Sequence, residues 1–117
     1  MLLHLKQNRN NMSKIDKKAL EESIITALKT VTDPEIPVNI YDLGLIYEIN
    51  IDDDANVSLV MTLTNPNCPV ADKLPADVKK AAESATGVNS VNVTLVFEPV
   101  WSKDMISDAA MLELGLL

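Results

Sequence analysis

The chain has a single cysteine, Cys68, and its setting decides which chemistry the sequence allows. Cys68 lies between Pro66 and Pro69 in the connector T-N-P-N-C-P, residues 64–69. An unpaired cysteine is often a small buried apolar residue, but this one is placed in a polar segment stiffened by proline. A helix is predicted close after it, and a helix dipole favours a thiolate whereas nearby carboxylates oppose one. A buried thiol and a reactive thiol therefore both stay open.

Three short motifs supply polar side chains that could act together with this thiol. They are D-P-E (33–35), D-L-G (42–44) and T-L-T (62–64), and they contribute the candidate site residues Asp33, Glu35, Asp42, Thr62 and Thr64. Carboxylates can polarise a thiol, offer a metal oxygen ligands or contact a partner, and threonine hydroxyls can fix a connector by hydrogen bonds. The alternative is structural, because aspartate is common in turns and threonine is common in strands.

Several kinds of site are disfavoured by what the sequence lacks. A thiol hydrolase needs a base beside the cysteine, and the single histidine, His4, lies near the N-terminus. There is no C-x-x-C pair and no Gly-rich phosphate loop, and one cysteine cannot hold an iron–sulfur cluster, which normally takes four ligands. The remaining roles for Cys68 are transient metal ligation, a site completed by a partner, or ligation across a homodimer. This pattern indicates a carrier or adaptor rather than an enzyme.

The elements that must position these residues follow from hydrophobic periodicity. Helical spacing with polar residues opposite begins at Ser13, which together with Asp16 resembles a capping box. Alternation of period two later predicts strands, with Tyr47 and Phe97 facing the core and Thr62 on the other face. Pro75 is awkward inside the second helix, which Gly87 is expected to cap. The expected helices cover 13–33, 70–86 and 103–114, the last capped by Ser102, and the strands cover 45–51, 57–64 and 91–97.

This order, α-β-β-α-β-α, predicts an α/β fold of the two-layer α+β kind, with helices packed on a three-stranded mixed sheet. Consecutive strands are usually adjacent, which favours the sheet order 1-2-3, with a split arrangement as the alternative. An antiparallel hairpin followed by a right-handed crossover brings the connectors 33–44 and 64–69 and the residue Glu98 to one end of the sheet. The candidate site residues are therefore expected to converge there, where open α/β sheets usually bind ligands.

Length and charge narrow the class of protein further. A chain of 117 residues has room for one domain, expected over 13–117, with 1–12 as a disordered extension. Residues 33–117 carry fourteen Asp/Glu against four Lys/Arg, which disfavours binding to nucleic acid or to an anionic membrane. The lone cysteine fits a reducing compartment, and no apolar run reaches the roughly 20 residues of a membrane span. We therefore expect a soluble cytoplasmic protein.

The motifs also resemble those of a known family. The stretches D-P-E-I-P-V-N-I-Y-D-L-G-L-I-Y (33–47), M-T-L-T-N-P-N-C-P-V-A (61–71) and W-S-K-D-M…L-E-L-G-L (101–116) are similar to the SufT/PaaD-like metal–sulfur cluster biosynthesis family. The resemblance implies an auxiliary factor between an iron–sulfur scaffold or carrier and recipient apoproteins, with the motif cysteine at Cys68. We expect no stably bound cofactor, although a transient cluster stays open. Val100 and Ile106 depart from the family pattern, which weakens the expectation that Trp101 shapes the site.

Three rival functions remain. An accessory protein for assembly of an aromatic-ring oxygenase of the phenylacetate type would share the fold and serve one complex. A thiol peroxidase or hydrolase would use Cys68 directly. A nucleic-acid module would share the element order, but the acidic body and the missing G-x-x-G loop disfavour it.

Overall fold

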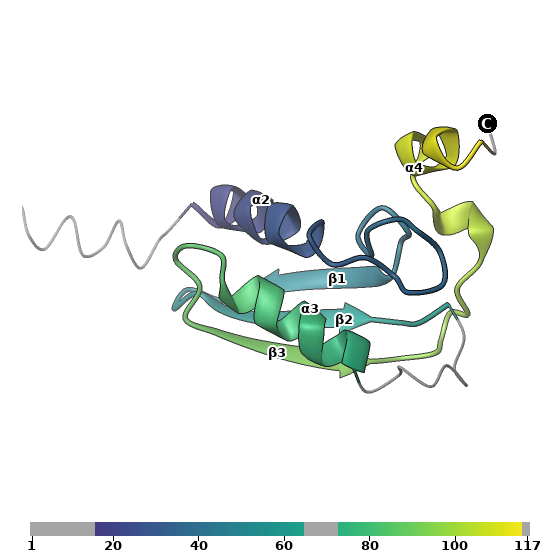
Figure 1. The fold of residues 1–117 in the computed structure, drawn as a ribbon. Coiled ribbons are helices and arrows are strands. Elements are labelled where there is room, and N and C mark those ends of the chain that lie inside the picture. Colours follow the sequence, from purple (N-terminus) through teal and green to yellow (C-terminus); the bar gives the residue numbers. More distant parts are fainter. Residues whose placement is uncertain (1–15, 65–72, 116–117) are drawn as a thin grey trace, which may run out of the picture.

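The computed structural model describes residues 16–64 and 73–115 and confirms the predicted fold class. A sheet of three strands carries two helices, and a short 3-10 helix and a third α-helix follow the last strand (Figure 1). In chain order the elements are α2 (Lys17–Leu28), β1 (Ile46–Ile51), β2 (Asn56–Met61), α3 (Lys73–Glu83), β3 (Ser90–Leu95), η1 (Lys103–Met105) and α4 (Asp108–Glu113). No helix within these described stretches is long and apolar enough to cross a membrane.

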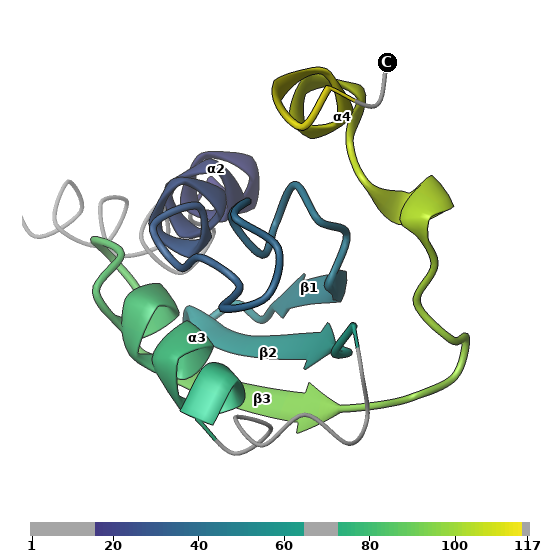
Figure 2. The ribbon, with the colours of Figure 1, turned by 45° about the vertical axis from the view of Figure 1, so that its right-hand side comes forward.

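The sheet has the predicted order β1-β2-β3. β1 and β2 are antiparallel, and β2 and β3 are parallel in a regular register from Asn56 opposite Ser90 to Met61 opposite Leu95. α2 and α3 lie on the same face of the sheet, and α4 stands away from it (Figure 2). The outer face of the strands carries mostly polar side chains such as Ser58, Asn92 and Thr94, all exposed, which is typical of a two-layer fold.

The core lies between the sheet and the two helices. Alternate residues of β2 are buried beneath α2 and α3, and both helices bury residues at helical spacing. The fully buried side chains of this layer include Ile24, Leu28, Leu59, Met61 and Val78. Each such apolar side chain contributes roughly 1.5–3 kcal/mol when buried, so this contact accounts for most of the cohesion of the two layers.

The first helix is shorter at both ends than its periodicity predicts. Its N-cap is Asp16, whose Oδ1 accepts a hydrogen bond from the Ala19 amide at 3.0 Å, whereas the expected cap Ser13 lies outside the described residues. The helix ends at Leu28, well before Pro34. The chain turns earlier because Val31 accepts a backbone hydrogen bond from Ile40 at 2.9 Å, which competes with further helical bonding.

α3 explains Pro75 and corrects the prediction for Gly87. The helix begins at Lys73, so Pro75 lies in its first turn, where backbone amides have no partner within the helix and proline is tolerated. The helix ends at Glu83, before Gly87. Gly87 has a φ of +95°, so it shapes the loop that leads to β3 instead of capping the helix.

A β-bulge in β1 breaks the alternation that the sequence suggested. Ile46 lies opposite Met61 but Glu48 lies opposite Val60, so Tyr47 is an extra residue on β1. A bulge turns its side chain away from the regular pleat, and the Tyr47 hydroxyl donates to the carbonyl of Pro99 at 2.7 Å. The prediction that Tyr47 continues the core-facing row of β1 is therefore wrong.

The C-terminal part also differs from its prediction. The single helix expected over 103–114 is interrupted at Ile106, whose ψ of 136° is extended. α4 starts after a new N-cap, Ser107, whose hydroxyl accepts from the Ala110 amide at 3.2 Å. Phe97 lies beyond the end of β3 at Leu95 and is 41% exposed instead of facing the core, so the prediction for it is wrong.

Candidate functional site

Four chain segments meet at one end of the sheet, as the topology predicts. They are the connector 33–45 before β1, the residues after β2, the start of α3 and the chain that leaves β3 (Figure 1). Backbone hydrogen bonds hold the first, second and fourth of these segments together: the Thr62 amide donates to Leu45 at 2.8 Å, and the Val96 amide donates to Met61 at 2.8 Å. We call this the site end; Cys68, with the rest of 65–72, lies outside the described residues.

Asp33 organises the D-P-E loop through its side chain. Its Oδ1 accepts hydrogen bonds from the amides of Glu35 at 2.8 Å and Ile36 at 3.0 Å, and its own amide donates to Val38 at 3.1 Å. Asp33 is only 5% exposed, whereas Glu35 is exposed. The turn role considered for Asp33 is therefore present, and Glu35 is the acid of this loop that is open to solvent.

Asp42 is held in a similar way within the D-L-G turn. Its amide donates to Asn39 Oδ1 at 2.9 Å, and its Oδ2 accepts from Asn39 Nδ2 at 2.8 Å. Its carbonyl accepts from the Ser107 amide at 2.7 Å. Asp42 thus closes a local ring with Asn39 and also ties the chain before α4 to the site end.

The residues Pro99–Ser107, here called the C-terminal strap, are fastened to the D-L-G turn and to β1. Trp101 Nε1 donates to the Leu43 carbonyl at 2.7 Å, and the Tyr47 hydroxyl reaches Pro99. Gly44 has a φ of +81°, and a Cβ there would meet the carbonyl oxygen of Met105 and come within 2.9 Å of its Cβ. Only glycine allows the strap to pass so closely.

These contacts answer one doubt raised by the sequence. Val100 replaces a residue that would stiffen the strap, and it is 72% exposed. Trp101 is nevertheless partly buried and bonded to Leu43, so it does help to shape the site end. Sequence reasoning missed the roles of Asn39, Gly44 and Tyr47; Gly44, next to two buried leucines in a turn, was the signal that could have indicated a close backbone approach.

The two threonines after β2 differ in their surroundings. Thr64 is half-buried, whereas Thr62 is 1% exposed although strand alternation places it on the outer face. No hydrogen-bond partner for Thr62 Oγ1 is present among the described residues. A buried unpaired hydroxyl costs about 1–3 kcal/mol, and such a group usually has a reason to persist.

A small hollow adjoins the D-P-E loop. It has a volume of about 80 Å³ and lies between Thr32 and Pro34 on one side and Lys73, Leu74 and Asp77 of α3 on the other. In the part of the chain that the structure describes, no three His, Cys, Asp or Glu side chains gather closely enough to hold a metal ion. The described site end is therefore a hydrogen-bonded frame with an exposed acid, Glu35, and with two threonines, Thr62 and Thr64, that are buried or half-buried.

The fold and this end of the sheet define a class of small two-layer α+β domain that holds several connectors firmly at one sheet edge. Residues 21–95 match the family model described as iron–sulfur cluster assembly protein. The chain is 57% identical over 97 residues to an Fe-S protein maturation auxiliary factor of Porphyromonas gingivalis, covering 83% of this chain and 92% of that protein. The chain thus belongs to the iron–sulfur cluster assembly protein family.

One further relative agrees with this assignment, and one solved structure agrees with the fold. The Fe-S protein maturation auxiliary factor YitW of Bacillus subtilis is 39% identical over 99 residues, which cover 85% of this chain and 97% of that protein. The crystal structure of a domain of unknown function, DUF59, from Bacillus anthracis superposes with a TM-score of 0.77 at 37% identity and covers 86% of this chain and 95% of that chain. The predicted family and fold class are both confirmed.

Proposed function

We propose that this protein is an auxiliary factor in the maturation of iron–sulfur proteins, acting as an adaptor or transient carrier and not as an enzyme. The observation that carries the proposal is the 57% identity to a maturation auxiliary factor over 92% of that protein's length. The cluster is cargo in this function, and no stably bound cofactor is required. The protein works in the cytoplasm, where free thiols stay reduced.

Cys68 is the thiol that we propose meets metal, cluster or partner. Its segment is attached to the site end on both sides, through Thr64 after β2 and Lys73 at the start of α3. At this end of the sheet, the hydrogen bonds of Asp33 and Asp42 hold the D-P-E loop and the D-L-G turn. One thiolate supplies one of the four ligands that a cluster normally needs, so donor and recipient proteins supply the others.

The acids have separate parts in this proposal. Glu35 is exposed and contacts a partner or lends a transient oxygen ligand, whereas Asp33 and Asp42 mainly hold the loops that present Cys68. The Thr62 amide fixes the chain where it leaves β2 by its bond to Leu45, and the hydroxyls of Thr62 and Thr64 are offered to the neighbouring connector. Partners are scaffold or carrier proteins of cluster assembly and recipient apoproteins; nucleic acids and membranes are not partners. Ligation across a homodimer through Cys68 stays a prediction.

The test is the activity of a [4Fe–4S] enzyme, such as an aconitase, in cells that lack the gene. The strain is complemented with nothing, with wild type, with Cys68→Ala or with Ser58→Ala as a matched control on the exposed face of β2. We expect activity to fall without the gene and to return with wild type and Ser58→Ala only, at equal aconitase protein levels. Circular dichroism of the purified Cys68→Ala protein checks that it is folded, so that its failure to restore activity reports on the thiol itself.

Two other outcomes would count against the proposal. Normal aconitase activity without the gene, even under iron limitation, would contradict general maturation and favour the dedicated oxygenase accessory. Full rescue by Cys68→Ala would remove the thiol from the mechanism and leave an adaptor that acts through its surface. Turnover of peroxide by the purified protein with loss of the thiol would favour the thiol enzyme.

A further inference from the structure

β3 is an edge strand that lacks the usual protection against pairing with another chain. It pairs with β2 on one side, and no described strand lies on its other side (Figure 1). Proteins usually guard such edges with charged side chains, proline or a bulge. The stretch 84–97, which includes β3, has no charged residue and no proline, and its register with β2 is regular over all six residues.

The opposite edge of the sheet shows the protection that β3 lacks. β1 has a bulge at Tyr47 and a charged, exposed residue, Glu48, next to it. A bulge interrupts the row of peptide groups that a second strand would need. Only one of the two edges of this sheet is therefore suited to strand pairing.

We propose that two copies of this chain pair antiparallel through β3, forming one continuous six-stranded sheet. The hydrogen bond from the Val96 amide to Met61 shows that the peptide groups of Asn92 and Thr94 also turn toward β2. Peptide groups alternate along a strand, so those of Val91, Val93 and Leu95 turn toward the open edge. A two-fold axis at Val93 pairs these three residues with the same three of the second copy.

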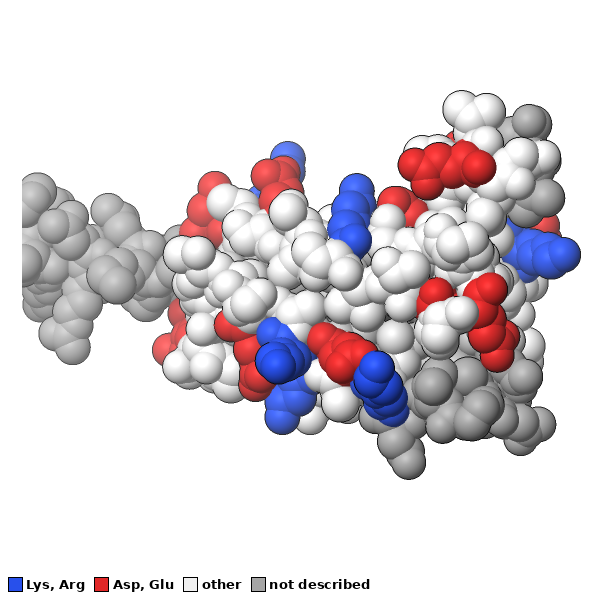
Figure 3. Space-filling view, viewed as in Figure 1, with Lys and Arg blue, Asp and Glu red and all other residues white. Residues whose placement is uncertain are grey.

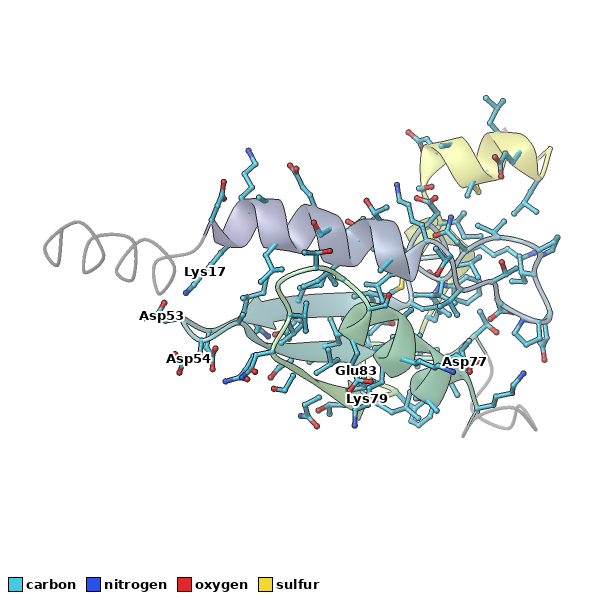
Figure 4. The ribbon with its side chains drawn as sticks, turned by 60° about the vertical axis from the view of Figure 1, so that its left-hand side comes forward. Lys17, Asp53, Asp54, Asp77, Lys79 and Glu83 are labelled. Carbon is cyan, nitrogen blue, oxygen red and sulfur yellow. The ribbon has the colours of Figure 1, made fainter. Side chains whose placement is uncertain are left out.

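The backbone edge is complementary to its own copy about a two-fold axis, and charge explains why two copies pair here rather than through another surface. The chain has a net charge of −7, so most approaches of two copies bring like charges together. An uncharged β3 edge avoids this repulsion. α3, which lies along β3, carries both signs: Lys79, Lys80 and Glu83 are exposed on it. Blue and red side chains lie next to one another over this helix in Figure 3, and Figure 4 labels Lys79 and Glu83.

This arrangement has a consequence for the site ends. Antiparallel β3 strands point in opposite directions, so the two site ends lie at opposite ends of the joined sheet. Each copy keeps its own site end open to partners. The pairing therefore differs from a dimer bridged by Cys68, and it holds whether or not the proposed function is correct.

The experiment combines sedimentation with amide hydrogen exchange, both under reducing conditions that exclude a Cys68 disulfide. We expect a monomer–dimer equilibrium between micromolar and millimolar concentration. Exchange of the Val91, Val93 and Leu95 amides should slow as the dimer forms, whereas the Asn92 and Thr94 amides, bonded to β2, should be protected at every concentration. This alternation would not arise from a dimer that uses another surface.

A variant with two lysines on the β3 edge tests the proposed pairing. Asn92→Lys with Thr94→Lys places like charges opposite each other across the two-fold axis and should weaken the dimer about tenfold or more. The control, Thr26→Lys with Asn50→Lys, adds the same charge on exposed residues of α2 and β1, and circular dichroism checks that both proteins fold. A monomer at all concentrations, a dimer equally weakened by the control, or exchange rates independent of concentration would overturn the proposal.

Discussion

At the scale of single residues, the site end is defined by side chains that serve the backbone. Asp33 and Asp42 accept hydrogen bonds from nearby amide groups, and the Trp101 ring nitrogen donates to a carbonyl. Thr62 is the exception, because its buried hydroxyl has no partner among the described residues. A residue whose type suggests a chemical role can therefore be required to hold a loop in place. Experiments must separate the functional role from the structural one.

Thr62→Val tests the unpaired hydroxyl. Valine has nearly the same shape and removes the polar group, so we expect the free energy of unfolding to rise by about 1 kcal/mol. Urea unfolding followed by circular dichroism measures the change. The control Thr94→Val, at an exposed position, should change the free energy of unfolding little. A fall in stability would mean that the hydroxyl is paired; a rise in stability with loss of aconitase rescue would mean that the hydroxyl is kept for function.

Asp33→Asn separates charge from hydrogen bonding at the D-P-E loop. An amide oxygen can accept the same bonds from Glu35 and Ile36, so we expect stability within about 1 kcal/mol of wild type, whereas Asp33→Ala leaves both amides unpaired and should lose about 1–3 kcal/mol. Denaturant unfolding compares the two variants. If Asp33→Asn unfolds as easily as Asp33→Ala, the negative charge itself stabilises the loop.

At the scale of elements, the C-terminal strap and the turns hold the connectors at the two ends of the sheet in place. The strap crosses the D-L-G turn at the one place where a glycine permits it. At the other end of the sheet, Asp52 in the β1–β2 turn accepts hydrogen bonds from the amides of Asp54 and Asn56 at 2.9 Å. Lys17 of α2 reaches Asp53 of the same turn at 2.9 Å (Figure 4), so both ends of the sheet are closed by local polar contacts.

Gly44→Ala should detach the strap. The added Cβ collides with the Met105 backbone, and alanine is strained at the φ of +81° that this position adopts. We therefore expect the free energy of unfolding to fall by more than about 1 kcal/mol. Trp101 is the single tryptophan, and its fluorescence emission should shift to the red as it enters water. Gly87→Ala is a matched control with a similar positive φ at the other end of the sheet; an equal red shift there would contradict a local effect on the strap.

Asp52 makes stability depend on pH. Hydrogen bonds from the backbone and side chain of Asn56 hold the pKa of Asp52 below its ordinary value of 3.8. A lowered pKa in the folded state stabilises the protein above pH 3.8, and this contribution is lost as the pH falls through the lower, folded value. We expect Asp52→Asn to lower Tm at pH 7 and the difference from wild type to narrow under acidic conditions; a constant difference would show that charge is not the cause.

At the scale of the whole molecule, the two ends of the sheet are built from different segments. The site end gathers four segments around the connections to 65–72, and the far end consists of the acidic turn and the loop before β3. α2 and α3 cover one face and leave β3 at an open edge (Figure 2). The proposed maturation partners and the proposed second copy would therefore bind at separate places.

The acidic body gives a prediction for the whole chain. With a net charge of −7, the protein should pass through a heparin column at low salt, because a polyanion is repelled. Retention that persists to physiological salt would contradict this expectation and favour the nucleic-acid alternative. The variant Asn92→Lys with Thr94→Lys adds two positive charges and leaves the chain acidic, so it should also pass through the column.

Periodicity, turn residues and charge were enough to determine the order of elements, the mixed sheet and the meeting of connectors at one end, because each depends on local patterns and on chain-handedness rules. The family motifs pointed to the candidate residues. Only the tertiary structure decided the bulge at Tyr47, the burial of Thr62 and the break at Ile106. The bulge and the break lie where the C-terminal strap packs against residues more than fifty positions earlier, and no local sequence pattern encodes such a contact.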